Sequence, residues 1–405
     1  MIRLAAALVC LFALTVPTSG GAAANEAARL SYSVSLTIVG PPQEGLLGAG
    51  LCLAGANGAE GNRVTAPKPD RASAWSPDGR SVAFSRGRRG SSIYVQDERE
   101  VSRKVVEAPT YAWGPGTVIP GSWSPDGQRI VYASFGIVGY LQSYSAILTV
   151  RTDGTDGRVV ASAVPNGSVT DPAWSPDGHS IAFADSSYGS PWGLYLIDPD
   201  GTNRRFLAPG GAQPSWSPDG ASIVFARQNE SSANISDLMI IGADGRGERR
   251  LTSQPGAEEN PAWSPDGDWI AFEQRAECGP SCGGGREGTD IAVIRPDGTD
   301  SRVLRGSPLA ELDPAWRPQA PKRPGRQRPC VIRGTDRANT IRGSSRGDFI
   351  LAGGGRDRIF GAAGDDLIDP GRGRDVVNGG PGYDAAYRDG YDKYRSIEAF
   401  YPPWR

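Results

Sequence analysis

The chain has 405 residues, enough for one large domain or two smaller ones. Its 43 basic and 45 acidic residues give a net charge of −2, which excludes the strongly basic proteins that bind nucleic acids or anionic membranes through overall charge. Glycine (55) and proline (33) together favour turn-rich β structure and stay below the share typical of disordered chains.

Residues 1–24 have the pattern of a secretory signal peptide. Arg3 supplies the positive start, residues 4–16 are apolar, and residues 22–24 are small alanines suited to cleavage. The apolar run is too short to span a bilayer, and an uncleaved N-terminal anchor is the alternative. Cys10 follows Val9 inside this run, which argues against lipid attachment. No later segment is apolar enough to cross a membrane, so we expect a protein that is secreted or held in the cell envelope.

The next elements are short strands, followed by a motif that returns along most of the chain. Strands are predicted at residues 31–39, 51–54 and 63–65. The motif is Ala-Trp-Ser-Pro-Asp-Gly at residues 74–79. Close copies begin at residues 122, 173, 215 and 262, and a decayed copy spans residues 315–318. A period of this size is typical of stacked or radial repeat folds.

One repeat shows what each unit builds. Residues 172–174 form a short apolar strand, and Ser-Pro-Asp-Gly at residues 175–178 has the composition of a tight turn. Strands at residues 181–183, 194–197 and 205–207 follow, the last after an Asp-Gly turn. Four antiparallel strands without helical periodicity predict a propeller blade.

The two ends of this region complement each other. The first strands lack the tryptophan motif, whereas residues 313–316 form an innermost strand with no blade after it. We therefore expect Ala315 and Trp316 to pair with the N-terminal strands and close a ring of six blades without an open edge. The repeated tryptophans are expected to be buried between blades: Trp75, Trp123, Trp174, Trp216, Trp263 and Trp316.

The Trp-Ser-Pro-Asp-Gly copies resemble the PD40, or WD40-like, repeat of TolB-like six-bladed β-propellers over residues 30–316. The resemblance implies an all-β fold. Propellers of this kind include hydrolases, lyases and binding proteins, so the fold leaves the activity open. TolB proteins carry a separate domain before the propeller, whereas this propeller begins almost directly after the signal segment.

The propeller offers one candidate ligand site. Asp171, Asn260 and Asp313 stand at or beside the start of innermost strands, where they would surround the mouth of the central channel. The alternative is that they cap turns. His179, the only histidine, follows a Ser-Pro-Asp-Gly turn, and neither a hydrolase elbow nor a Cys/His metal cluster is present. No catalytic residue is therefore assigned.

Four cysteines follow the signal segment: Cys52, Cys278, Cys282 and Cys330. An even count in an exported chain favours disulfides. Cys278 and Cys282 lie in a glycine-rich insertion at residues 277–288 and are expected to form a local bond, with free thiols or a metal as alternatives. Cys52 and Cys330 then remain as candidate partners.

The C-terminal part changes period. Residues 317–329 are rich in proline and arginine and predict a semi-stiff linker. Residues 333–387 repeat every nine residues, with glycines before an aspartate and an apolar residue two positions after it. The acidic or amide positions are Asn339, Asp348, Asp357, Asp366, Asp375 and Asp384. Residues 388–405 are expected to cap this region.

This period is similar to the RTX, or haemolysin-type, calcium-binding nonapeptide. The resemblance implies a parallel β-roll with two repeats per coil, so that Asn339 stacks on Asp357, Asp348 on Asp366, Asp357 on Asp375 and Asp366 on Asp384. These six residues are the expected Ca²⁺ ligands, completed by loop carbonyls. With one inward apolar residue per repeat, folding of the roll is expected to require the metal; a metal-free solenoid is the alternative. Arg337, Arg346, Ala352 and Pro370 replace expected glycines.

Two functions follow from these expectations. The first is an exported calcium-binding protein whose propeller is a scaffold for an unidentified protein or glycan, with no nucleic acid partner. The second is a secreted propeller enzyme, a polysaccharide lyase or glycosidase with an Asp/Glu site at the channel. Two carboxylates converging on the channel would favour the enzyme.

Overall fold

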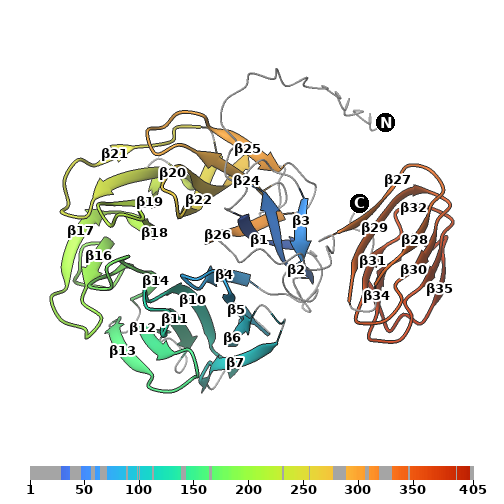
Figure 1. Ribbon diagram of the computed structural model, residues 1–405, viewed down its shortest axis with the longest axis horizontal. Helices are drawn as coiled ribbons and strands as arrows, with labels where there is room; N and C mark the ends of the chain where they lie inside the picture. Colours follow the sequence, from blue (N-terminus) through green and yellow to red (C-terminus); the bar gives the residue numbers. More distant parts are fainter. Residues whose placement is uncertain are drawn as a thin grey trace.

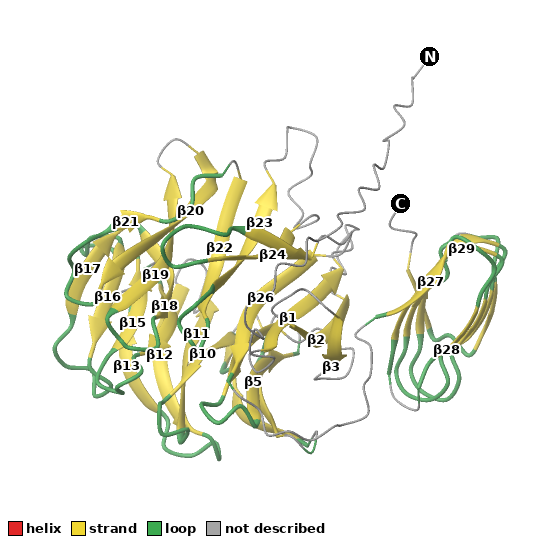
Figure 2. Cartoon of the chain, turned by 45° about the horizontal axis from the view of Figure 1, so that its top comes forward, coloured by secondary structure: helices red, strands yellow, loops and turns green. Residues whose placement is uncertain are grey.

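The computed structural model is built from strands and turns, and the residues it describes contain no helix (Figures 1 and 2). These residues are 29–36, 47–55, 60–63 and 71–401, the last range with gaps at 88–89, 98, 100, 112–113, 138–142, 164–166, 230–231, 255, 277–288, 306–309, 319–330, 345–346 and 389. The expected signal peptide, most of the expected linker, and Cys278, Cys282 and Cys330 lie outside them.

The first part of the described chain forms six four-stranded antiparallel blades. In the first blade, β26 (Ala310–Arg317) pairs with β1 (Arg29–Leu36), β2 (Leu47–Gly55) and β3 (Glu60–Arg63). The second blade contains β4 (Arg71–Trp75), β5 (Ser81–Arg86), β6 (Ser92–Asp97) and β7 (Ser102–Glu107). The third contains β10 (Thr117–Trp123), β11 (Arg129–Ile137), β12 (Ser143–Arg151) and β13 (Arg158–Ser162). The fourth contains β14 (Val169–Trp174), β15 (Ile181–Asp185), β16 (Gly193–Ile197) and β17 (Arg205–Pro209).

The last two blades are joined. They are β18 (Gly211–Trp216), β19 (Ser222–Asn229), β20 (Ser232–Gly242) and β21 (Arg249–Arg250), then β22 (Gly256–Trp263), β23 (Ile270–Ala276), β24 (Thr289–Ile294) and β25 (Arg302–Arg305). A parallel pair between Ser236 and Ala257 links β20 to β22. A small ribbon of β8 (Thr110–Tyr111) and β9 (Gly114–Pro115) lies between the second and third blades in sequence.

The ring closes through strands from both ends of the propeller, as the sequence predicts. Strand β26 pairs antiparallel with β1, with Trp316 opposite Leu30 and Ala315 opposite Ser31. The innermost strands β4, β10, β14, β18, β22 and β26 contact one another in succession around the ring. The six-bladed architecture is therefore confirmed, and β1 is paired on both sides, by β26 and by β2.

The Ser-Pro-Asp-Gly motif forms a hydrogen-bonded turn after each complete innermost strand. At residues 175–178, Ser175 Oγ donates to Asp177 Oδ1 (2.6 Å) and accepts the N–H of Ser180 (2.9 Å). Gly178 closes the turn by donating its N–H to the Ser175 carbonyl, at a φ of 77° that suits glycine. Equivalent Ser–Asp bonds recur in the other four copies. The motif therefore shapes each turn through its own side chains.

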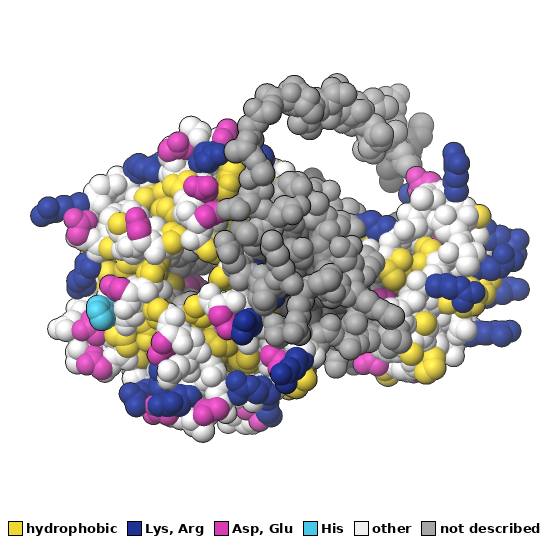
Figure 3. Space-filling view, viewed as in Figure 1, with side chains coloured by type: hydrophobic (Ala, Val, Ile, Leu, Met, Phe, Trp, Pro, Cys, Tyr) yellow, Lys and Arg dark blue, Asp and Glu magenta, His cyan; other side chains and the backbone are white. Residues whose placement is uncertain are grey.

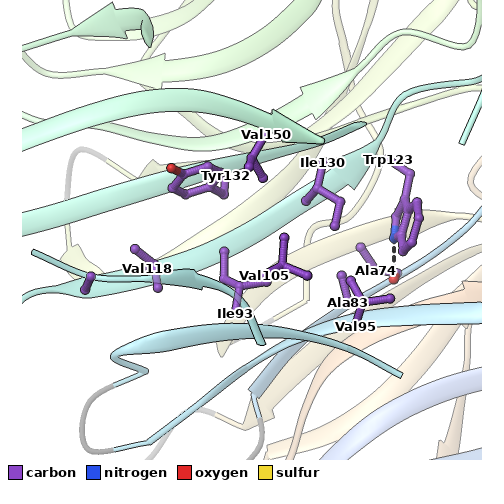
Figure 4. Close-up of a cluster of buried hydrophobic side chains, with 11 residues drawn as sticks. Ala74, Ala83, Ile93, Val95, Val105, Val118, Trp123, Ile130, Tyr132 and Val150 are labelled. Carbon is purple, nitrogen blue, oxygen red and sulfur yellow. Dashed lines mark hydrogen bonds between the residues drawn. The ribbon is translucent and has the colours of Figure 1, made fainter. Parts of the chain in front are cut away.

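Apolar clusters lie between neighbouring blades. Figure 4 shows the cluster between the second and third blades, where Ile93 and Val118 pack with Ile130 and Trp123 donates to the Ala74 carbonyl (2.9 Å). Phe84, Phe183, Phe225 and Phe272 fill the same kind of position and are fully buried. The expected burial of all six motif tryptophans is correct for Trp123 and Trp316 and wrong for the other four, which are half-buried. These four rings pack against the apolar clusters while part of their surface stays exposed.

The C-terminal part is a parallel β-solenoid with two sheets (Figure 2). One sheet contains β27 (Ile332–Thr335), β29 (Phe349–Gly355), β31 (Leu367–Asp369), β34 (Ala385–Tyr387) and β36 (Ala399–Tyr401), with β32 (Arg372–Gly373) pairing to β29. The other contains β28 (Thr340–Arg342), β30 (Arg358–Phe360), β33 (Val376–Asn378) and β35 (Lys393–Arg395). Partners are mostly 18 residues apart, such as Ile341 with Ile359. The expected inward residues form the core, which also contains Ala352.

Candidate metal centre

The aspartates of the nonapeptides stack at the spacing that the sequence predicts. Oδ1 of each aspartate accepts the backbone N–H of the residue 18 positions earlier, at 2.6–2.8 Å. The four donor–acceptor pairs are Asn339–Asp357, Asp348–Asp366, Asp357–Asp375 and Asp366–Asp384. Because the repeats alternate between two sides of the roll, these residues form two separate columns. Each inner aspartate therefore contacts the coil before it and the coil after it.

The second carboxylate oxygen of two of these aspartates is buried without a hydrogen bond. Asp357 and Asp384 are fully buried, and their Oδ2 atoms have no hydrogen-bond partner. Burial raises the pKa of both carboxyls, because a charged oxygen without a donor is poorly solvated inside the roll. A buried polar atom of this kind is costly unless a ligand satisfies it. A cation is the partner that would stabilise the charged form.

Backbone carbonyls add further oxygens beside these carboxylates. A Cβ on Gly371 would lie 1.7 Å from the Gly353 carbonyl oxygen, and one on Gly373 would lie 1.7 Å from the Gly355 carbonyl oxygen. A Cβ on Gly380 would lie equally close to the Ala362 carbonyl oxygen. Only glycine allows the loops to approach so closely, and the carbonyls of one loop consequently face the next loop of the same column.

The donor set fits calcium better than the transition metals. It consists of carboxylate and carbonyl oxygens, which suit Ca²⁺, whereas zinc sites use cysteine or histidine. Within the described ranges, no three His, Cys, Asp or Glu side chains gather as a metal cluster. A cation between two loops would accordingly take at most two carboxylates and draw its remaining ligands from loop carbonyls. This is the composition expected for the RTX resemblance.

The solenoid extends beyond the expected repeat boundary at residue 387. Strand β35 continues one sheet, with Tyr394 opposite Val377, and β36 continues the other. Asp392 Oδ1 accepts the Asp375 N–H (2.8 Å), and Glu398 Oε2 accepts the Asp384 N–H (2.6 Å). Asp392 and Glu398 thus take the place of the repeat aspartate in a last coil. Their spacings of 17 and 14 residues hide them from a search for a strict period.

The candidate channel residues share one backbone position. Asp171 (φ 53°) and Asn260 (φ 50°) lie three residues before the tryptophans of β14 and β22, where the pairing register shifts. Gln213 (φ 55°) holds the same position in β18 and was missed because glutamine is not a typical residue for a left-handed backbone. Asp313 lies in β26 at the matching place, and its side chain is outside the described set. The structure therefore places them on a repeated bulge of the innermost strands.

Hydrogen bonds tie this bulge to neighbouring strands. The N–H of Asn260 donates to Gln213 Oε1 (2.9 Å), and Asn260 Nδ2 donates to Glu273 Oε1 (2.6 Å). Thr170 Oγ1 donates to Asp171 Oδ2 (2.8 Å). Asp171 is exposed, whereas Gln213 and Asn260 are half-buried. These contacts connect adjacent blades near the ring axis and leave Asp171 accessible to solvent.

Two family models match the chain. The TolB beta propeller domain matches residues 110–235, and the RTX calcium-binding nonapeptide repeat matches residues 333–368 and 363–385. The chain combines a TolB-like β-propeller with RTX calcium-binding repeats. No curated protein sequence matches it significantly.

Solved structures share the propeller fold. TolB from Acinetobacter baumannii is 19% identical with a TM-score of 0.57, and the match covers 73% of this chain and 68% of that one. Hydrazine synthase from Kuenenia stuttgartiensis is 14% identical with a TM-score of 0.54, and the match covers 73% of this chain and 48% of that one. At these identities the likeness shows the fold alone, and the fold is compatible with binding proteins and enzymes alike.

The structure also describes two other propeller residues that the sequence analysis singled out, His179 and Cys52. His179 lies in the turn after Asp177, whose Oδ1 accepts its N–H (3.0 Å), and the residue is exposed. Cys52 lies in β2 opposite Arg63, but the proposed disulfides fall outside the described residues. The part of the chain that is described has no helix with the length and apolar character needed to cross a membrane.

Proposed function

We propose that this chain is an exported calcium-binding protein whose propeller serves as a scaffold for binding a protein or a glycan. The observation that carries the proposal is the pair of buried aspartates, Asp357 and Asp384, each with a carboxylate oxygen that the protein leaves without a hydrogen bond. Calcium between stacked loops would satisfy these oxygens together with the neighbouring carbonyls.

The energetics of the RTX roll support a metal requirement. Its core contains one column of isoleucines and smaller residues per sheet, around buried aspartates that repel one another when charged. Ordering each residue costs about 1–2 kcal/mol of backbone entropy, and the apolar core of the roll is small against that cost, even with Phe349 and Leu367 buried beside the inward column. Metal binding and folding of the roll are therefore expected to be coupled. The same proposal assigns Asn339 and Asp348, in the first coils, as calcium ligands.

Binding rather than catalysis is the proposed role of the propeller. The described residues on the inner bulge are one carboxylate and two amides, Asp171, Gln213 and Asn260, rather than two converging carboxylates. The further carboxylates Glu258 and Glu273, of which Glu273 accepts a hydrogen bond from Asn260, are both buried. Export is supported by the RTX repeats, since about millimolar calcium is an extracellular condition, and by the signal-like sequence of residues 1–24.

The test is a calcium titration of the full-length protein, followed by hydrogen exchange resolved by peptide. We expect peptides from residues 333–401 to gain protection at about 10⁻⁴–10⁻³ M calcium, while propeller peptides stay protected with or without the metal. Magnesium is the matched control, because it demands a tighter octahedral shell and should not replace calcium. Equal protection of the roll in chelator, or an equal response to magnesium, would contradict the proposal.

A further inference from the structure

The charges of the RTX roll are separated between its interior and its surface. Residues 331–401 contain equal numbers of acidic and basic residues, eleven of each. More than half of the acidic side chains are buried: Asp348, Asp357, Asp366, Asp369, Asp375 and Asp384. None of the described arginines or lysines of the roll is buried. A roll that is formally neutral therefore presents a positive surface, and bound calcium would compensate the interior charge without reducing the positive charge outside.

Part of this positive charge lies on one flat sheet face. In β28, β30, β33 and β35, the residues on either side of the inward position point outward. They form two rows in register, Thr340–Arg358–Val376–Lys393 and Arg342–Phe360–Asn378–Arg395. We call these eight residues the basic face. It contains four cations and no acidic residue, and all four cations are exposed.

The cations of the basic face are not engaged in ion pairs among the described residues. The salt bridges of the structure involve other arginines and lysines. Arg342 lies over the ring of Phe360, with its guanidinium carbon 4.8 Å from the ring centroid. The other sheet of the roll contrasts with this face, since its outward residues Phe349, Leu367 and Ala385 are buried. Figure 3 shows Lys and Arg side chains gathered at the outer edge of the roll, where Figure 1 places β28, β30 and β35.

We propose that the basic face binds a linear acidic polysaccharide. Neighbouring strands are about 4.8 Å apart, so Arg358 and Lys393 are separated by roughly 10 Å and Arg342 and Arg395 by roughly 14 Å along the roll. A compact anion would reach one or two of these cations, whereas an extended chain lying across the strands would reach all four. Arginine is suited to carboxylate and sulfate groups, because its planar fork donates two parallel hydrogen bonds.

The same face is poorly suited to other polyanions. Single-stranded nucleic acids need aromatic rings on which bases stack, and the one ring here, Phe360, is half-buried beneath Arg342. Membrane surfaces bind helices and loops with large apolar tips, but the most exposed apolar side chain on the face is Val376, at 36%. The inference rests on the calcium-dependent folding proposed above, because the rows exist only when the coils stack. It narrows the proposed glycan partner to an acidic one.

The test uses the full-length protein at millimolar calcium and polygalacturonate as the probe. We expect the double variant Arg358→Gln/Arg395→Gln to bind about tenfold more weakly and with a shallower dependence on salt, as loss of charge-assisted contacts requires. The matched control is Arg80→Gln/Arg246→Gln, which removes the same charge from exposed positions of the propeller and should bind as the unchanged protein does. Arg358→Lys/Arg395→Lys should retain most of the affinity.

The remaining results distinguish failure of this inference from failure of the proposed function. Hydrogen exchange of residues 333–401 is measured on every variant, so that loss of binding counts only where the roll still folds with calcium. A roll that folds with calcium but does not bind polygalacturonate would overturn this inference and leave the proposed function standing. A roll that does not respond to calcium would instead contradict the proposed function. Equal binding to neutral dextran, to single-stranded DNA or to phosphatidylserine vesicles would overturn the assignment of an acidic polysaccharide.

Discussion

Aspartate occupies two opposite environments in this protein. In the propeller turns, Asp177 Oδ1 accepts bonds from Ser175 Oγ and the His179 N–H, and these donors lower the pKa of the carboxyl. In the roll, burial raises the pKa of Asp357, which keeps one oxygen without a donor. The turn satisfies its aspartate by itself, whereas the roll aspartate needs an external partner. One residue type thus has a structural role in the propeller turns, and in the roll we propose a ligand role for it.

Asp366 is expected to be the most sensitive residue of the roll. Its Oδ1 accepts the Asp348 N–H and its own N–H donates to Asp384 Oδ1, so it connects three coils. Asp366→Ala should leave a buried amide unsatisfied, which costs about 1–3 kcal/mol, and should raise the calcium midpoint about tenfold. Asn339→Ala is the control, because Asn339 lies in the first coil and should shift the midpoint much less. The calcium titration of circular dichroism measures both, and equal shifts would contradict the proposed bridging role.

Glu258 is expected to make the propeller sensitive to pH. Burial raises its pKa to about 7, with Asp237 reinforcing the shift and Thr252 and Arg250 opposing it. The folded protein holds this proton at pH values where the unfolded chain has lost it. The resulting stabilisation is complete below the ordinary glutamate pKa of 4.5 and is lost as the pH rises to about 7.

Denaturant unfolding at pH 5 and pH 8, in excess calcium, measures this effect. The free energy of unfolding should fall by up to about 3 kcal/mol over that range. Glu258→Gln should remove most of the decrease, because glutamine keeps the shape without the charge. Glu248→Gln is the control, since Arg227 lowers the pKa of Glu248 and its removal should not flatten the profile. A profile for Glu258→Gln as steep as that of the unchanged protein would refute this assignment.

At the scale of elements, regular features were predictable and junctions were not. The blade strands, their turns and the stacking of Ile341 on Ile359 follow from alternation and from fixed periods, which are local properties of the sequence. The link between Ser236 and Ala257 and the left-handed backbone of Gln213 depend on how one blade meets the next. The coil containing Asp392 and Glu398 was not predicted, because the spacing of these residues from the aspartates before them is irregular.

The strand that closes the ring offers an element-scale prediction. Trp316 of β26 is buried, and its Nε1 donates to the Ala262 carbonyl of the preceding blade (2.9 Å). Trp316→Phe should lower propeller stability by about 1–3 kcal/mol, because it removes that bond and some packing. Trp192→Phe is the matched control, because Trp192 is 46% exposed and should lose little. Thermal unfolding measured with saturating calcium compares them, and equal losses would argue against a role for Trp316 in closure.

At the scale of the whole molecule, the propeller and the roll are each stabilised by a different kind of interaction. The propeller has apolar clusters between successive blades, such as the one around Val131 and Phe183. The roll combines a thin apolar column with buried carboxylates. Stability of the first should be independent of divalent ions, while stability of the second should follow calcium by mass action.

Calorimetry of the full-length protein should consequently show two transitions. Raising calcium from about 10⁻⁴ to 10⁻² M should move one of them to higher temperature and leave the other in place. Chelator should abolish the calcium-dependent transition, because we propose that metal binding and folding are coupled in the roll. The Asp366→Ala protein provides the internal check, because only its calcium-dependent transition should shift. A single transition that moves as a whole would show that the domains unfold together.

The pairing of β1 with β26 sets the order in which the two domains can fold. Leu30 and Trp316 are 286 positions apart in the sequence, whereas partners in the roll are mostly 18 apart. Loop-closure entropy makes the longer contact costlier by about 2.5 kcal/mol, and contacts of such separation slow folding. The chain must therefore hold an unpaired strand edge until residue 316 is available, and ring closure should be the slow step. The roll pairs residues that are close in sequence, so under the proposed metal requirement we expect its coils to form one after another once calcium binds.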